Sequence, residues 1–426
     1  MVIADGIEIS GEFKEAFDIM EGTRRHLYVT GRAGTGKSTL LSLFKEKTKK
    51  NAVFLAPTGV AAVNVGGATL HSFFRFPPEV LTDVKIKRLF DKKELFSSLD
   101  TLVIDEVSMV RADLMQAVDI SLRKNRQKDV PFGGVQLILF GDLYQIPPVI
   151  ADSQVRGYLE DVYGGVHFFC APAIGEADLA VIELTKVYRQ EDPHFLEILD
   201  AVRRGSYTDC HLAAINSRVG ICPPEGEAVI TLAARNSTVS RINLEMLKKL
   251  PGKARVYVAE VEGQFDEKSY PTDKELYLKE GAQVMLLTNA PQRLWVNGTL
   301  AVVEKLSASS AEVSFGGVTC AVEPAVWEKV EYYYDREEKK IKSKVTGTFR
   351  QLPLKLAWAV TIHKSQGQTF DRAVIDLQGG AFEYGQLYVA LSRCRSLEGV
   401  YLKSPVRPSD IRVDPRVLEF EKTKIS

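Results

Sequence analysis

The sequence lacks the features that mark membrane-spanning and secreted proteins. No apolar run approaches the roughly 20 residues that a helix needs to cross a bilayer. The opening stretch, MVIADGIEIS, carries acidic side chains and no basic segment, so we expect no signal peptide. The five cysteines are scattered without a C-x-x-C pair, which disfavours a zinc site or a disulfide framework and suits a reducing compartment. We therefore expect a cytoplasmic protein.

The chain also lacks an excess of charge of either sign. Lysine and arginine together number 55, and so do aspartate and glutamate. This balance excludes a uniformly basic surface, although a local cationic groove is compatible with it. At 426 residues the chain is too long for one comfortable core, so we expect two or more domains.

What the sequence does contain is a phosphate-binding loop. GRAGTGKS, residues 31–38, fits G-x-x-x-x-G-K-[ST] between a β-prone run and a stretch with helical spacing, a context that disfavours a chance glycine-rich turn. Backbone amides of such a loop surround phosphates, and the following helix adds its partial positive charge. We expect Lys37 to reach the β- and γ-phosphates of ATP and Ser38 to bind Mg²⁺. Further nucleotide contacts are expected from Gly34, Thr35, Gly36 and Thr39.

Two later apolar runs end in polar residues. TLVIDEVSM reaches Asp105 and Glu106, and VQLILFGDLYQIPPV reaches Asp142 and Gln145. Such runs are typical of buried strands in a parallel sheet, which binds ligands at its carboxyl edge. Asp105 is expected to hold Mg²⁺, Glu106 to act as a general base, and Gln145 to orient water or sense the γ-phosphate. The alternative for both carboxylates is a solvated strand end.

The stretch APTGVAAVNVGGATLHSFFRF is irregular and aromatic. It contains Thr58, Asn64, His71 and Phe73. Small polar residues beside aromatics suit a strand of nucleic acid, because bases stack on rings while amides and hydroxyls hold the backbone. The alternative is that the phenylalanines, Phe73 included, are core residues beneath a loop.

The second half of the chain predicts another sheet without a phosphate loop. Its predicted strands are AVITLAARN, which ends at Asn236, followed by AQVMLLTN, LKLAWAVTIHKSQG, RAVIDLQGG and GVYLKS. Arg189 and Arg393 would complete the charge at the γ-phosphate from this domain. A surface ion pair is the alternative for either arginine. The capped helix that begins near Asp192 needs only a packing explanation.

The stretch AVTIHKSQGQTF is a second polar loop, far along the chain from Lys37. Through Gly367 it could contact nucleotide, and through Thr361, His363 and Lys364 a polymer that crosses both domains. A structural histidine is the alternative for His363. Residues 291–350 instead show alternation and glycine pairs, which are typical of short antiparallel strands, and we interpret them as a small inserted β-barrel.

In their order, these motifs resemble those of the Pif family of superfamily-one DNA helicases, relatives of the RecD-like helicases. The resemblance covers nearly the whole chain and rests on GRAGTGKS, APTGVAAVNVGGATLHSFF, VIDEVSM, GDLYQIPPV, ELTKVYRQ, LAWAVTIHKSQGQTF and YVALSRC. It implies an α/β fold with two RecA-like P-loop domains built on parallel sheets. The implied parts are a first domain over 1–180 with a wedge insertion at 64–80, a second domain over 181–290 and 351–426, and the barrel at 291–350.

The resemblance also implies an activity, a 5′-to-3′ helicase that uses ATP and Mg²⁺. By resemblance, the ATP-site residues keep the roles given above. The family's motifs that touch single-stranded DNA contain Thr58, His71, His363 and Lys364. Further candidates for DNA contacts are Asn64, Phe73, Asn236 and Thr361. Implied partners are single-stranded, duplex or forked DNA, with quadruplex DNA as an additional candidate, for a monomer associated with the nucleoid.

One position departs from the family. Phe13 stands near the place where members often carry a glutamine that reads adenine, which puts base discrimination in doubt. Two other functions are open to the sequence. A DNA-binding clamp switched by ATP needs less hydrolytic machinery than is present, and an ordinary P-loop kinase would not need the paired domain with its two arginines.

Overall fold

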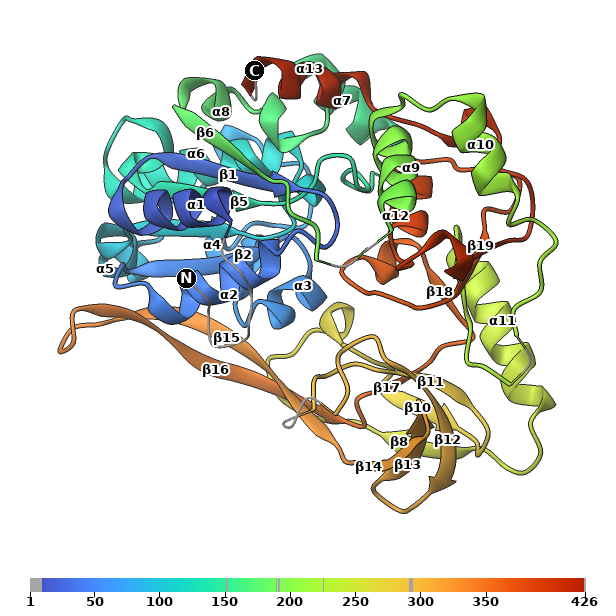
Figure 1. The fold of residues 1–426 in the computed structure, drawn as a ribbon. Helices are drawn as coiled ribbons and strands as arrows, with labels where there is room; N and C mark the ends of the chain where they lie inside the picture. The colour runs from blue at the N-terminus through green and yellow to red at the C-terminus, as the bar shows by residue number, and fades with distance from the viewer. Residues whose placement is uncertain are drawn as a thin grey trace.

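A computed structural model gives the fold and describes residues 10–150, 152–188, 190, 192–224, 226–290 and 294–424. Two parallel sheets lie side by side, and an antiparallel region lies below both of them (Figure 1). Among the described residues, every helix is too short or too polar to span a bilayer.

Six parallel strands form the first sheet, in the order β3-β2-β4-β5-β1-β6. They are β1 (His26–Gly31), β2 (Ala52–Ala56), β3 (Ala68–Thr69), β4 (Thr101–Ile104), β5 (Gln136–Phe140) and β6 (Leu179–Leu184). The carboxyl ends of β1, β4 and β5 share one edge, which brings the phosphate loop, Asp105 and residues 141–145 together. β6 pairs with β1, so the strand predicted to open the second domain at residue 181 is the edge strand of the first sheet.

Alternating side chains on β1 divide the core of this sheet between its two faces. Leu27 and Val29 pack against α1 (Gly11–Gly22) and α2 (Lys37–Lys47), and Tyr28 packs on the opposite side. The opposite face is covered mainly by α6 (Ala112–Arg126). Five shorter helices complete this part: α3 (Gly59–Asn64), α4 (Leu70–Phe74), α5 (Lys93–Ser98), α7 (Ser153–Tyr163) and α8 (Pro172–Glu176).

Four parallel strands form the second sheet, in the order β18-β7-β19-β20. They are β7 (Ile230–Ala233), β18 (Ala359–Thr361), β19 (Ala373–Asp376) and β20 (Val400–Leu402). Its helices are α9 (Pro193–Arg204), α10 (Asp209–Asn216), α11 (Asn236–Lys249) and α12 (Gln386–Leu391). The last helix, α13 (Pro415–Lys424), returns to the first part of the molecule, where Phe420 stacks on Phe169 at 4.5 Å between ring centroids.

The antiparallel region begins earlier than the sequence indicated. Its strands are β8 (Arg255–Val258), β9 (Glu260–Gly263), β10 (Glu275–Leu278), β11 (Gln283–Leu286), β12 (Leu300–Leu306), β13 (Ala311–Phe315), β14 (Val318–Val322), β15 (Ala325–Asp335), β16 (Lys340–Gln351) and β17 (Leu354–Leu356). β11, predicted for the second parallel sheet, pairs here with β12 and β17 because its buried apolar residues suit either kind of sheet. The barrel at 291–350 and the wedge at 64–80 remain predictions, and the second of these segments contains the edge strand β3 and α4.

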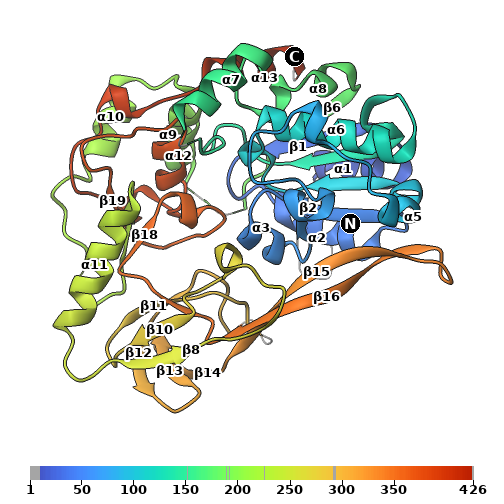
Figure 2. The same ribbon diagram turned by 180° about the vertical axis from the view of Figure 1, so that it is seen from behind.

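A long hairpin of β15 and β16 reaches from the antiparallel region across the first sheet domain (Figures 1 and 2). The Tyr332 hydroxyl donates to the Phe54 carbonyl oxygen at 3.3 Å, and the backbone amide of Ile341 donates to Asn51 Oδ1 at 3.0 Å. Arg336 Nε pairs with Glu94 at 2.7 Å. The hairpin therefore links parts of the chain more than two hundred residues apart.

Candidate nucleotide and nucleic-acid site

The phosphate loop connects β1 to α2 through glycines whose conformations few other residues adopt. Gly36, at φ 89°, directly precedes the first helical residue, Lys37. Gly31, at φ 144°, lies so close to the Leu184 carbonyl that a Cβ atom would collide with it. Lys37 Nζ donates to the carbonyl oxygens of Gly31 at 2.6 Å and Arg32 at 2.9 Å. The loop therefore fixes the position of the ammonium group that is expected to bind phosphate.

Residues from both sheet domains line one cavity of about 420 Å³, a size that suits a small-molecule ligand. The first domain contributes most of the wall. The predicted residues that line it are Gly34, Thr35, Gly36, Lys37, Ser38, Thr39, Glu106, Gln145, Gly367 and Arg393. Phe13 and Tyr188 add aromatic surface, and Thr369 and Arg395 complete the side that belongs to the second domain. Arg189 lies outside the described residues.

Two adjacent carboxylates follow β4. Glu106 adopts a left-handed backbone conformation, at φ 49° and ψ 44°, and its amide donates to Asp105 Oδ1 at 2.9 Å. Burial raises the pKa of Asp105. Burial, and then the neighbouring Asp105, raise the pKa of Glu106 to about 7, while Lys37 and Arg393 oppose the shift. A carboxylate with a pKa near neutrality is suited to general base catalysis, since it can both take and release a proton at physiological pH.

The donor set at this edge fits Mg²⁺ only together with a nucleotide. Among the described residues there is no group of three or more histidine, cysteine, aspartate or glutamate side chains that could hold a metal ion. Protein Mg²⁺ sites of this kind use one or two carboxylates plus the phosphates of the substrate. Asp105 and Ser38 match that requirement, and a divalent cation would relieve the repulsion that raises the pKa of Glu106.

Arg393 is a buried residue of the second domain, which excludes the surface ion pair considered as its alternative. Its side chain is 1% exposed. Its guanidinium donates to the carbonyl oxygens of Val389 at 2.9 Å, Gln368 at 3.2 Å and Ser365 at 3.3 Å. Burial lowers its pKa, partly offset by nearby acidic groups that include Glu106. These three carbonyl oxygens hold the Arg393 side chain in a fixed position in the lining of the cavity.

The loop that follows β18 contacts the first domain directly. Gln366 Nε2 donates to Gln145 Oε1 at 3.2 Å, so the polar loop of AVTIHKSQGQTF and the residue predicted to sense the γ-phosphate are bonded to each other. Gln145 Nε2 also lies 3.4 Å from Asp142 Oδ2. Through the bond from Gln366 to Gln145, the second domain contacts the nucleotide cavity at a second place, in addition to Arg393.

The predicted DNA contacts differ in their exposure. Asn64 ends α3, Asn236 begins α11 and Lys364 follows β18, and all three side chains are exposed. Other candidates have roles within the fold. The Thr58 hydroxyl caps α3 by accepting from the Ala61 amide, and the Thr361 hydroxyl accepts from the Lys364 amide.

The two candidate histidines are half-buried. Burial lowers the pKa of His71, and Arg111 lowers it further. Burial also lowers the pKa of His363. Both imidazoles are therefore kept neutral near pH 7, so they would contact DNA through hydrogen bonds rather than as cations.

Phe73 is corrected to a core residue. It is 2% exposed, and its ring lies 4.8 Å from that of Phe74, 5.5 Å from that of Phe96 and 6.1 Å from that of Tyr332. A ring enclosed on these sides offers no face to a base. The packing alternative was the right one, and the aromatic content of the stretch reflects the core under α4.

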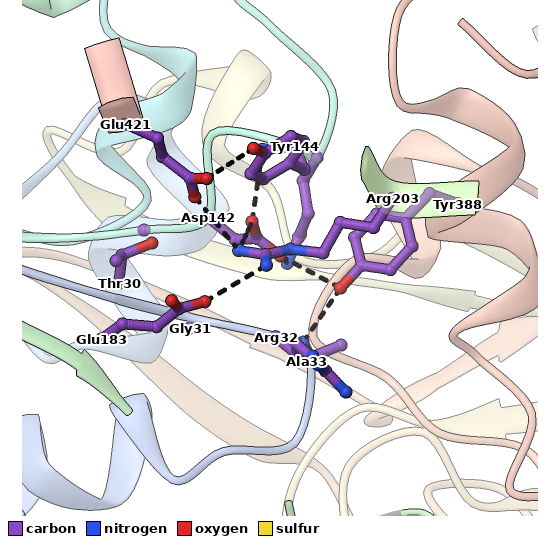
Figure 3. A network of polar contacts seen from close by, with 12 residues as sticks. Thr30, Gly31, Arg32, Ala33, Asp142, Tyr144, Glu183, Arg203, Tyr388 and Glu421 are labelled. Carbon is purple, nitrogen blue, oxygen red and sulfur yellow. Dashed lines mark hydrogen bonds and ion pairs between the residues drawn. The ribbon is translucent and has the colours of Figure 1, made fainter. Parts of the chain in front are cut away.

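Sequence reasoning missed a set of buried polar side chains behind the phosphate loop, formed by Asp142, Arg203 and Tyr388 (Figure 3). A signal was present for one of them. Phe195, Leu199 and Arg203 follow one another at four-residue spacing on α9, so an arginine occupies the apolar stripe of a helix. An arginine in such a position requires buried partners.

A phosphate loop that faces a second parallel sheet across a shared cavity defines the chain as a P-loop protein built on two parallel sheets. The sequence matches the family described as PIF1-like helicase over residues 9–210. The chain belongs to this family, and the resemblance seen in its motifs is confirmed.

Individual relatives match over most of the chain. It is 36% identical over 411 residues to the ATP-dependent DNA helicase PIF1 of Homo sapiens, a match that covers 93% of this chain and 61% of that protein. It is 34% identical over 435 residues to the ATP-dependent DNA helicase Pif1 of Bdellovibrio bacteriovorus, which covers 98% of this chain and 92% of that protein. The chain thus spans about three fifths of the human relative.

Pif1 from Bacteroides is similar in structure. Its unliganded form superposes with a TM-score of 0.90 at 35% identity, covering 99% of this chain and 98% of that one. Its complex with ADP-AlF4 gives 0.90 and its complex with single-stranded DNA gives 0.71, each at 36% identity and covering 98% of this chain and 97% of that one. This chain therefore superposes more closely on the first two structures than on the third.

Proposed function

We propose that the chain is the core of an ATP-dependent DNA helicase that moves 5′-to-3′ along single-stranded DNA and unwinds duplex or forked DNA. The observation that carries this proposal is the cavity in which Lys37 and Glu106 of the first domain meet Arg393 of the second. Because ATP in this cavity touches both domains, its hydrolysis changes how strongly they are held together. Membership of the PIF1-like helicase family supports the same activity.

Five residues in or beside the cavity have roles in hydrolysis. Lys37 binds the β- and γ-phosphates, and Ser38 and Asp105 would hold Mg²⁺, which neutralises phosphate charge when bound. Glu106 accepts a proton from water as the water oxygen attacks the γ-phosphorus and the bond to the β-phosphate oxygen breaks. Arg393 stabilises the negative charge that develops on the departing oxygens.

The candidate DNA contacts support a polymer that crosses both domains. Asn64 belongs to the first domain, and Asn236 and Lys364 belong to the second, where Lys364 is two residues from the Gln366 that bonds Gln145. Bacteroides Pif1 has been solved bound to single-stranded DNA, and another Pif1 structure concerns DNA unwinding at forked duplex DNA by two coordinating Pif1 helicases, which supports DNA as the partner of this chain. The 5′-to-3′ direction, quadruplex binding, a monomeric state and association with the nucleoid rest on the family resemblance alone.

The proposal is tested first by ATP hydrolysis with and without single-stranded DNA. We expect strong stimulation, and a rate that is indifferent to DNA would contradict coupling between the two sites. DNA affinity should fall with salt, with a log–log slope of about −0.7 for each neutralised phosphate.

Direction and unwinding need a second assay, which compares a duplex with a 5′ tail with the same duplex carrying a 3′ tail. We expect strand separation only on the 5′-tailed substrate and only with hydrolysable ATP. Separation from the 3′ tail would reverse the proposed direction. ATP-dependent DNA binding without strand separation on either substrate would favour the clamp.

A further inference from the structure

Asp142 is the centre of a buried network directly behind the nucleotide cavity (Figure 3). It follows β5, and its side chain is fully buried. Oδ1 accepts from the Tyr144 amide at 3.2 Å and pairs with Arg203 at 3.3 Å. Oδ2 accepts from the Tyr388 hydroxyl at 3.2 Å and lies 3.4 Å from Gln145 Nε2. One carboxylate thus joins three segments of the chain that are far apart in sequence.

Arg203 supplies the charge that allows this carboxylate to be buried. Its side chain is fully buried at the end of α9, and it pairs with Glu183 at 3.2 Å as well as with Asp142. Its guanidinium lies 4.3 Å from the centre of the Tyr144 ring. Burial by itself lowers the pKa of Arg203, but Asp142 and the other acidic partners outweigh burial and raise it. A fixed, permanently charged arginine therefore holds the Asp142 side chain in place.

Tyr388 carries the network into the phosphate loop. It lies on α12, the helix that leads to Arg393, and its side chain is buried. The Tyr388 hydroxyl donates to Asp142 and accepts from the backbone amide of Ala33, at 3.3 Å, within the loop itself. Gly385, which directly precedes α12, lets the start of this helix lie close to Tyr144, because a Cβ atom at residue 385 would collide with the Tyr144 carbonyl oxygen.

The network contacts three parts of the nucleotide site, which a purely structural role would not require. Its three ends lie at the phosphate loop through Ala33, at the γ-phosphate side of the cavity through Gln145, and on the helix that precedes Arg393. These are the parts that must keep a fixed relation while ATP is hydrolysed. Glu183 at 3.2 Å and Glu421 at 3.9 Å also pair with Arg203.

We infer that Arg203 and Tyr388 are positioning residues that act through Asp142 to align the phosphate loop and Gln145 with the second domain. This inference rests on the proposed function. Neither residue lines the nucleotide cavity, whereas Lys37 and Ser38 do, so loss of alignment should lower turnover and leave ATP binding nearly intact.

The test compares two tyrosines that are both buried in the same part of the protein. Tyr388→Phe removes the hydroxyl that links Asp142 to Ala33. Tyr28→Phe is the matched control, because its hydroxyl bonds Thr30 Oγ1 at 3.2 Å and the Gly141 carbonyl at 3.3 Å without contacting Asp142 or Ala33. We expect Tyr388→Phe to lower kcat for DNA-stimulated ATP hydrolysis about tenfold with KM for ATP within about twofold, the size expected for one lost hydrogen bond to a charged group. The control should stay within about twofold of the unaltered protein in both constants.

Arg203→Lys provides a second variant, because lysine keeps the charge and loses the fork that bonds Asp142 and Glu183 together. It should lower kcat by a similar factor, and the double variant with Tyr388→Phe should lose less than the product of the two factors, since both act through one carboxylate. If Tyr388→Phe does not fold, as judged by its thermal melt, Arg203→Lys alone carries the test against Tyr28→Phe.

Three results would overturn the inference. They are an unchanged kcat in Tyr388→Phe or Arg203→Lys, an equal loss in Tyr28→Phe, and losses that multiply independently in the double variant. Each of them is distinct from failure of the proposed function, which would appear as an unaltered protein whose ATP hydrolysis does not respond to DNA.

Discussion

The first sheet domain has two neighbours, and it meets them with opposite chemistry. Towards the second parallel sheet the contacts include polar groups that are buried or part-buried, as in the bonds between Gln366 and Gln145 and between the Tyr388 hydroxyl and Asp142. Towards the β15–β16 hairpin the contact is an aromatic group around Phe73 and Tyr332, flanked by exposed ion pairs. A bound triphosphate changes the electrostatics of a polar boundary far more than those of an aromatic one. Nucleotide should therefore act on the first boundary, and the second should chiefly contribute stability.

The largest effect is expected at the polar boundary, from Arg393→Ala. Turnover should fall by about 10³ to 10⁵, the range for an arginine that completes γ-phosphate charge, while ATP affinity changes little. Single-turnover hydrolysis and equilibrium nucleotide binding measure the two separately. Arg395→Ala is the matched control, because Arg395 lines the same cavity but is exposed and paired with Asp371 at 3.1 Å. Equal losses in both variants would mean that the cavity needs positive charge without regard to position.

Glu106→Gln comes next, with an expected fall in turnover of about 10² to 10⁴. The base acts only when ionised, and its pKa in the free protein is about 7, so kcat/KM for ATP of the unaltered protein should decline as the pH falls below about 7 and level off above it. The variant should lose that dependence, because glutamine does not titrate. A pH profile that is the same in both proteins would assign the base to another group.

At the aromatic boundary, Phe73→Ala should lower the free energy of unfolding by about 3 to 5 kcal/mol, as for other large core truncations. Urea denaturation measures this change in the free energy of unfolding. Phe90→Ala is the control, since Phe90 is 74% exposed and should change stability by no more than about 0.5 kcal/mol. If Phe73→Ala instead lowered DNA affinity and left stability unchanged, Phe73 would be assigned to the DNA-binding surface.

The smallest effect is expected from Arg336→Ala at the tip of the same hairpin. Its pair with Glu94 is exposed on both sides, so solvent and salt screen it, and the urea midpoint should not shift measurably. A double-mutant cycle with Glu94→Ala at low and high salt checks this. A shift that persists at high salt would show that the Arg336–Glu94 pair contributes more than a screened surface ion pair does.

The predicted residues that line the nucleotide cavity share a local cause. The phosphate loop, Glu106 and Gln145 each follow an apolar strand directly, and the carboxyl ends of neighbouring parallel strands meet at one edge. Arg393 was found because α12 and the turn after it form a continuous motif in the sequence. In these cases a short stretch determines both the chemistry and the position.

The residues that were missed depend on partners far along the chain. Arg203 stands in the apolar stripe of α9, but the sequence does not show its partner, because its role depends on Asp142, 61 residues earlier. The apolar run of β11 is compatible with a parallel or an antiparallel sheet, and its partners β12 and β17 decide between them. Phe73 is aromatic whether it faces a base or a core, and the neighbouring rings settle the question.

The contact between Lys37 and the carbonyls of Gly31 and Arg32 has a consequence for nucleotide affinity. A lysine side chain loses about 2 kcal/mol of rotamer entropy when it is immobilised. Here most of that loss occurs as the chain folds, so an arriving phosphate meets an ammonium group that is already aligned. The Lys37 side chain is therefore preorganised for phosphate binding. We expect the affinity for nucleotide to depend more on the exchange of the Gly31 and Arg32 carbonyl oxygens for phosphate oxygens at Nζ than on ordering of the side chain.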